Sequence, residues 1–150
     1  MFKILFVCHG NICRSPMAEF VMKDLVRKAG VAERFEIASA AVSREEIGNP
    51  VYGPARRELA RHGIGCAGKT ARQITGADLK HYDHIYYMDA SNARYLRQLF
   101  GPNHGCLPLL HRDVADPWYT GDFERTWEDI LEGCSRILRE LTGMEEISYD

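Results

Sequence analysis

A cysteine, an arginine and a serine stand close together near the start of the chain, in the segment VCHGNICRSPMAE at residues 7–19. Cys8 carries a thiol, which is a strong nucleophile once it is deprotonated. Arg14 can hold two oxygens of one phosphate group side by side, because its guanidinium is planar. Ser15 can donate a hydrogen bond to the sulfur of Cys8. Residues of these types indicate nucleophilic attack on a phosphoryl group.

The residues between Cys8 and Ser15 suit a loop that encloses an anion. Gly10 and Asn11 tolerate the positive backbone angles of a tight curl. In such a curl the backbone N–H groups point inward, and the helix expected after the loop adds the positive end of its dipole. The sequence therefore predicts that phosphate binds in a cradle loop made of His9, Gly10, Asn11, Ile12, Cys13 and Arg14.

The spacing of Cys8 and Arg14 is weak evidence by itself, because a buried cysteine at the end of a strand is usually an inert apolar residue. The full pattern Cys-x-Gly-Asn-x-Cys-Arg-Ser-Pro between a strand and a helix is far more specific. Cys8, His9 and Cys13 do not have the usual spacing of zinc ligands, and no second pair of ligands is evident. We expect no metal and no cofactor.

Departure of the leaving oxygen of a phosphate ester needs a proton donor. The candidates are Asp113, Asp116, Asp122 and Asp129. Asp129 falls within the last expected helix, and Asp122 has the position of its N-cap. Asp116 precedes a proline and is followed by Trp118 and Tyr119, which could partly desolvate its carboxyl group. From the residues alone, Asp113 and Asp116 stay about equally good candidates.

The elements that must position these groups alternate between strands and helices. Strands are expected over residues 3–7, 35–38, 84–88 and 106–110, the last at a sheet edge because it contains Pro108. Helices are expected after Pro16, from Pro54 to Gly63, near Thr75, over 91–100 with Ser91 as the cap, and over 123–141. This order predicts one α/β domain over residues 1–150, with a parallel sheet covered by helices on both faces.

The composition argues against several kinds of partner. The 150 residues carry 19 Lys and Arg against 21 Asp and Glu, so no basic surface for nucleic acid is expected. The first apolar run is too short for a signal peptide or a membrane span. Five cysteines without regular spacing fit a reducing compartment. We expect a cytoplasmic protein without a membrane partner, and nothing in the sequence requires more than a monomer.

Over nearly its whole length the chain resembles the low-molecular-weight protein tyrosine phosphatase family. Besides residues 7–19, the matching segments are EIGNP (46–50), RHGI (61–64), ARQI (71–74), MDASN (88–92) and DPWY (116–119). The resemblance implies a four-stranded, Rossmann-like parallel sheet and phosphotyrosine-containing proteins as substrates. It implies that Cys8 is the nucleophile, Arg14 the phosphate clamp and Ser15 the donor to the thiolate, with Asp116 as general acid and base.

Further roles follow for residues around this set. Asn11 is expected to hold the shape of the loop, and His62 to support it through a hydrogen bond or to be a structural histidine. Cys13 either packs locally or, as in the family, forms a disulfide that protects Cys8 from further oxidation. Trp118 and Tyr119 are expected to line the cleft.

The chain departs from the family at Glu45, where a Trp or Tyr usually forms one wall of the cleft. Charge at this rim predicts weaker turnover of bulky aryl phosphates. Three alternatives remain. The first is an arsenate reductase, which would need cysteines near residues 81–92. The others are a protein-arginine phosphatase, which typically has a small polar residue where Ile12 stands, and a phosphopeptide-binding module without turnover. A pure binder would need neither Cys8 nor Asp116.

Overall fold

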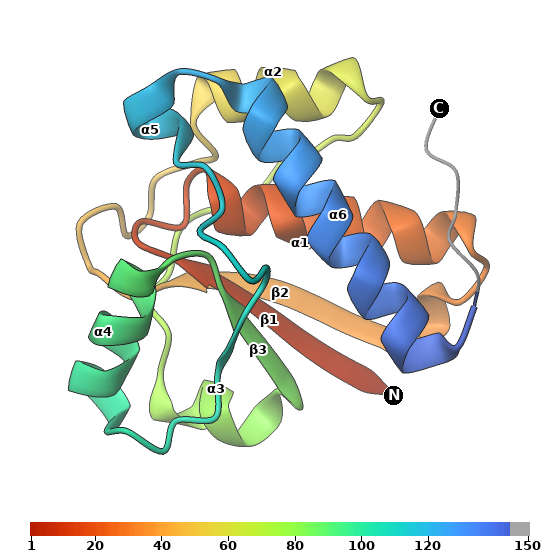
Figure 1. The fold of residues 1–150 in the computed structure, drawn as a ribbon. Coiled ribbons are helices and arrows are strands. Elements are labelled where there is room, and N and C mark those ends of the chain that lie inside the picture. Colours follow the sequence, from red (N-terminus) through yellow and green to blue (C-terminus); the bar gives the residue numbers. More distant parts are fainter. Residues whose placement is uncertain (145–150) are drawn as a thin grey trace.

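A parallel sheet between two layers of helices forms the centre of the molecule in the computed structural model, which describes residues 1–144 (Figure 1). The four strands are β1 (Phe2–Cys8), β2 (Phe35–Ala41), β3 (His84–Tyr87) and β4 (Leu107–Pro108), and they lie in the order β2-β1-β3-β4 with every pair parallel. The helices are α1 (Arg14–Lys28), α2 (Gly53–Arg61), α3 (Gly76–His81), α4 (Ala90–Phe100), α5 (Pro117–Thr120) and α6 (Phe123–Thr142), with a 3-10 turn η1 over Ala32–Arg34. The predicted α/β fold with a four-stranded parallel sheet is confirmed.

The central strand β1 is apolar throughout because helices cover it on both faces. Ile4 and Phe6 belong to a core cluster shared with α1, α2 and α6, whereas Leu5 and Val7 belong to a second cluster shared with α3 and α4. All four side chains are fully buried. This alternation follows from the two-residue period of a strand, and it explains why the run shows no polar alternation in the sequence.

Helix α6 packs on α1 (Figure 1) and comes very close to the segment that follows β4. At Gly133 a Cβ atom would lie 2.5 Å from Cγ of Leu109, which is itself fully buried. A side chain at position 133 therefore cannot fit unless Leu109 moves. Residues 126–136 of α6 lie against residues 109–115.

Several helix ends match the sequence and two do not. Thr75 with Asp78 forms the expected capping box, and Asp122 caps α6. Ser91, however, is not the cap of α4: Asp89 is, because its carboxylate accepts a hydrogen bond from the N–H of Asn92. The four-residue helix α5, which Asp116 caps, was not expected from the sequence. Within residues 1–144, no helix has the length and apolar character needed to cross a membrane.

The order of the strands determines where a ligand can bind. From β1 the chain leads to β2 on one side, and from β3 it leads to β4 on the other side. The connections that follow β1 and β3 therefore run in opposite directions. In open parallel sheets, ligands bind outside the carboxyl ends of the strands at such a point. Cys8 ends β1, and Asp89 follows β3 by two residues.

Candidate active site

A cavity of about 490 Å³ opens at this edge of the sheet. Its wall includes most of the site residues predicted from the sequence: Cys8, His9, Gly10, Ile12, Cys13, Arg14, Glu45, Asp116, Trp118 and Tyr119. Asn11 and Ser15 lie behind this wall and contact Cys8, while His62 lies elsewhere. Residues far apart in the sequence therefore meet here because four segments converge on the ends of β1 and β3.

Cys8 lies at the base of the cavity with three hydrogen-bonding groups around its sulfur. The backbone N–H groups of Asn11 and Ser15 donate to Sγ at 3.3 and 3.4 Å, and Ser15 Oγ lies 3.0 Å away. Ser15 Oγ also accepts a hydrogen bond from Nδ2 of Asn11 at 2.7 Å. Its one proton has two acceptors within reach, the Cys8 sulfur at 3.0 Å and the Ala40 carbonyl at 3.5 Å, and the sulfur is the nearer of the two. This arrangement stabilises a negative charge on Sγ.

Asn11 holds the cradle loop in its curled shape. Its φ is +60°, and in the part of the chain that the structure describes it is the one residue other than glycine with a positive φ. The side chain is buried, donating to Ser15 Oγ and Ser39 Oγ and accepting from the backbone N–H of Arg72. These contacts compensate the strain of a left-handed conformation, which asparagine tolerates better than most residues.

Arg14 is the first residue of α1, and its guanidinium is almost completely buried. One nitrogen donates to the carbonyl of Val114 at 3.1 Å, and the other lies 2.9 Å from the carboxylate of Asp89 and 3.4 Å from that of Asp116. Burial opposes the charge on Arg14, but the nearby Cys8, Asp116 and Asp89 outweigh it and raise the pKa of the guanidinium. A permanent, rigidly held cation therefore stands beside Cys8.

Asp89 is a functional residue that the sequence reasoning missed. Its carboxylate pairs with Arg14 through one oxygen and caps α4 through the other. Two sequence features could have identified it: Asp89 directly follows the strand expected over residues 84–88, at the carboxyl end of the sheet, and it lies in the segment MDASN. We now assign Asp89 the role of fixing the orientation of the arginine.

The structure separates the two aspartates that the sequence left as alternatives. Asp116 lines the cavity, with one carboxylate oxygen facing Arg14 and the other accepting a hydrogen bond from the N–H of Trp118 at 3.1 Å. Asp113 is exposed and caps the start of α4 through Ala90 N–H instead. Asp116 is thus placed for proton transfer in the cavity, and Asp113 is not among the residues that line it.

Aromatic and charged side chains form the mouth of the cavity. Trp118 and Tyr119 lie on α5 and are 57% and 85% exposed, so they are not core residues. Tyr52 contacts Trp118 with ring centroids 5.1 Å apart and extends this wall. On the other side, the ring of His9 packs edge-on against Tyr95, and its Nε2 lies 2.9 Å from the carboxylate of Glu45.

The proposed support of the cradle loop by His62 needs correction. His62 lies at the end of α2, outside the cavity, where Nε2 is 3.1 Å from Glu58 and the ring stacks on Trp127 with centroids 3.6 Å apart. The side chain borders a second hollow of about 590 Å³ between α2 and the start of α6. His62 therefore joins α2 to α6, which matches the alternative of a structural histidine.

Cys13 lines the cavity but differs from Cys8 in its surroundings. It is 7% exposed, and burial, with a smaller effect of nearby Cys8, raises its pKa to about 12. Cys13 is therefore a neutral thiol at physiological pH. All five cysteines are free thiols, and the described residues contain no group of three or more His, Cys, Asp and Glu side chains that could hold a metal ion.

Comparisons with known proteins agree with this geometry. The family model described as low molecular weight phosphotyrosine protein phosphatase matches residues 3–146. The chain is 39% identical to the low molecular weight protein-tyrosine-phosphatase YfkJ of Bacillus subtilis over 98% of this chain and 100% of that protein. It is 37% identical to the human low molecular weight phosphotyrosine protein phosphatase over 90% of this chain and 92% of that protein. The crystal structure of YfkJ superposes with a TM-score of 0.90, covering 95% of this chain and 96% of that one. SP-PTP from Streptococcus pyogenes, 38% identical, superposes with a TM-score of 0.88, covering 95% and 94%.

Proposed function

The chain belongs to the low molecular weight phosphotyrosine protein phosphatase family, and we propose that it hydrolyses phosphotyrosine in proteins through a phosphocysteine formed on Cys8. One observation carries this mechanism: the Cys8 sulfur, surrounded by hydrogen-bonding groups, shares a cavity with Arg14 and Asp116. A cysteine that only fills space in a core would have apolar neighbours. A nucleophile needs the donors, the cation and the acid that are present here.

In the first step the Cys8 thiolate attacks phosphorus opposite the tyrosine oxygen. The S–P bond forms while the P–O bond to tyrosine breaks, and Asp116 gives its proton to the departing oxygen. Arg14 and the backbone N–H groups of the cradle loop hold the other phosphate oxygens. Because Asp89 and the Val114 carbonyl fix the guanidinium, little reorganisation is needed as the charge moves.

In the second step water attacks the phosphocysteine and releases inorganic phosphate. The Asp116 carboxylate takes a proton from that water, and the S–P bond breaks with its electrons returning to sulfur. Ser15 and the N–H groups of Asn11 and Ser15 stabilise the departing thiolate, as they stabilise the nucleophile in the first step. The enzyme then returns to its starting protonation state.

The mouth of the cavity suits an aromatic phosphate ester. We propose that the exposed ring of Trp118, backed by Tyr52, packs against the phenyl ring of the substrate, and that Tyr119 extends this surface. The opposite rim carries the hydrogen-bonded pair His9 and Glu45, with Tyr95 packed edge-on against His9. A carboxylate at position 45 is a poor surface for a phenyl ring, which supports weaker turnover of bulky aryl phosphates.

We propose that Cys13 protects the nucleophile under oxidising conditions. Oxidation of the Cys8 thiolate by a peroxide gives a sulfenic acid, and the Cys13 thiol displaces water from it to form a disulfide. Both cysteines line the same cavity and both are free thiols, which supports this role. Reduction by a dithiol returns both thiols. Recovery of activity after peroxide and dithiothreitol in the native protein, but not in Cys13→Ser, would test it.

We propose a monomeric enzyme of the cytoplasm: the cavity is lined without a residue from a second copy, and five cysteines without regular spacing fit a reducing compartment. We propose phosphotyrosine-containing proteins as its partners, without nucleic acid or a membrane.

The test is hydrolysis of p-nitrophenyl phosphate across pH under reducing conditions. We expect Cys8→Ser to abolish turnover and Asp116→Asn to lower it by about 10² to 10⁴, with competitive inhibition by vanadate. A Cys8→Ser variant as active as the native protein would exclude the phosphocysteine mechanism. Arsenate reduction and phosphate binding without turnover would then be the functions to measure.

A further inference from the structure

Asp116 lies in a stretch between β4 and α5 that has no regular secondary structure. Backbone N–H and C=O groups withdrawn from water need partners, and here those partners must come from other segments. Val114 finds one on each side: its N–H donates to the Met88 carbonyl at 2.9 Å, and its carbonyl accepts from Arg14 at 3.1 Å. The next residue, Ala115, directly precedes Asp116.

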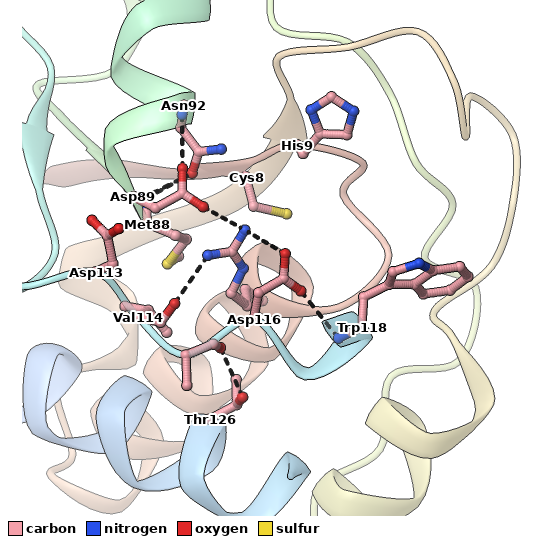
Figure 2. A network of polar contacts seen from close by, with 12 residues as sticks. Cys8, His9, Met88, Asp89, Asn92, Asp113, Val114, Asp116, Trp118 and Thr126 are labelled. Carbon is pink, nitrogen blue, oxygen red and sulfur yellow. Dashed lines mark hydrogen bonds and ion pairs between the residues drawn. The ribbon is translucent and has the colours of Figure 1, made fainter. Parts of the chain in front are cut away.

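Both backbone groups of Ala115 are held by α6. The N–H donates to Oδ2 of Asp129 at 3.1 Å, and the carbonyl accepts from Oγ1 of Thr126 at 2.9 Å. Thr126 and Asp129 are three residues apart, so they lie on the same face of the helix. Figure 2 shows Thr126 with its bond to the segment that carries Val114 and Asp116. We call these two side chains and Ala115 the Ala115 brace.

The brace is built from side chains that are out of water. Thr126 is 0% exposed and Asp129 is 3% exposed, so their hydrogen bonds are stronger than they would be at the surface. The charge of Asp129 is balanced through its other oxygen, which lies 3.0 Å from Nη2 of Arg112 and 3.3 Å from Nε of Arg125. The two arginines thus leave Oδ2 available for the N–H of Ala115.

We propose that Thr126 and Asp129 are positioning residues for the general acid, an inference that rests on the role proposed for Asp116. With the position of Ala115 fixed on both sides, the direction of the following residue is set within one peptide unit, about 3.8 Å. Asp116 then places one oxygen toward Arg14 and the other on the N–H of Trp118. Proton transfer needs heavy atoms within about 2.6–3.2 Å, so a slip of roughly 1 Å would slow it severely.

The decisive measurement compares kcat/KM for phenyl phosphate and p-nitrophenyl phosphate. Phenol is the poorer leaving group, so its departure depends more on the proton from Asp116. We expect Thr126→Val, which replaces the hydroxyl by a methyl group of similar size, to lower kcat/KM about tenfold for phenyl phosphate and about threefold for p-nitrophenyl phosphate. Thr126→Ser should restore both values to within about twofold, and Thr126→Val should have no further effect in an Asp116→Asn background.

A second pair of variants tests the other arm of the brace. Asp129→Ala removes the partner of Ala115 N–H, whereas Glu132→Ala removes another partner of Arg112 and leaves the brace intact. Circular dichroism and thermal melting establish that each variant is folded. We expect Asp129→Ala to lower kcat/KM more for phenyl phosphate than for p-nitrophenyl phosphate, and Glu132→Ala to show no such difference between the two substrates.

Two results would overturn the inference. Equal losses on both substrates for Thr126→Val, or the same loss in the Asp116→Asn background, would show that the brace affects only general stability. Failure of the proposed acid itself is seen separately: Asp116→Asn alone would then lose activity equally on both substrates, and the inference would fall with it.

Discussion

The close contact between Gly133 and Leu109 predicts that Gly133→Ala destabilises the native protein but stabilises a variant in which Leu109 is shortened. In Gly133→Ala the new Cβ would lie 2.5, 2.7 and 3.0 Å from Cγ, Cδ1 and Cδ2 of Leu109, distances that atoms cannot keep. Overpacking of this kind costs about 1–3 kcal/mol, and the three contacts argue for the upper part of that range. Alanine also gains about 1 kcal/mol over glycine from helix propensity. The expected net loss is about 2 kcal/mol of unfolding free energy.

A double-mutant cycle separates the two contributions. Leu109→Ala alone removes a fully buried side chain and should cost about 2–5 kcal/mol. In that background the clash is gone, so adding Gly133→Ala should stabilise the protein by about 1 kcal/mol from propensity alone. The coupling between the two sites should therefore be about 3 kcal/mol.

Urea unfolding followed by circular dichroism measures all four members of the cycle, and a 2 kcal/mol loss corresponds to a melting temperature lower by roughly 4–8 °C. Gly133→Ala that is as stable as the native protein, or that has the same effect with and without Leu109, would refute the packing argument. Helix α6 would then be able to move away from the segment that leads to Asp116 at little cost in stability.

Three further predictions concern the site. Asn11→Ala should lower kcat/KM by about 10- to 100-fold and unfolding free energy by about 2–4 kcal/mol, because it loses two buried hydrogen bonds and one partly buried one and strains the positive φ. Asn11→Gly should keep the kinetic defect with a smaller stability loss, and equal stability of the two variants would contradict the strain argument. Glu45→Tyr should lower KM for p-nitrophenyl phosphate by about 2- to 10-fold, because an aromatic ring would replace a charge at the rim of the cavity. Glu33→Tyr, in the 3-10 turn before β2, should leave this KM unchanged. An unaltered KM in both variants would argue against a role of position 45 in the cleft. Burial raises the pKa of Cys13 to about 12, so the folded state favours its neutral thiol. Cys13 should therefore stay unlabelled by iodoacetamide at pH 8 in the native protein, and rapid labelling seen by mass spectrometry would oppose this. The contribution of the neutral thiol to stability should decline as pH rises from about 9 towards 12.

The arrangement around Arg14 explains why the site needs a folded protein. The guanidinium is held by residues that follow β3 and by the carbonyl of Val114, while Cys8 and the cradle loop follow β1. Each contact fixes a group that would otherwise have to be oriented during the reaction. Because α6 in turn holds Ala115, the acid depends on a helix that contributes no residue of its own to the proposed chemistry.

Much of the fold could be predicted from the sequence because its signals are local. The apolar run of β1, the helical spacing of α6 and the caps at Thr75 and Asp122 depend on neighbours within a few residues, and all are confirmed. The cap of α4 was wrong by two residues, since both Asp89 and Ser91 are good cap residues and only the surrounding fold selects between them. The short helix α5 was missed because four residues give no detectable periodicity.

The cradle loop of the site was also determined by the sequence itself, because its residues are nearly contiguous and their types limit how the backbone can curl. Which aspartate lines the cavity with Cys8 was decided only by the tertiary structure. Asp113 and Asp116 lie in the same stretch after β4; the carboxylate of Asp113 accepts a hydrogen bond from Ala90 N–H, whereas Asp116 lines the cavity. The same holds for Asp89 beside Arg14 and for Thr126 and Asp129 beside Ala115. These contacts join segments that are distant in the sequence, and no local preference encodes them, since they exist only once the sheet and α6 have packed.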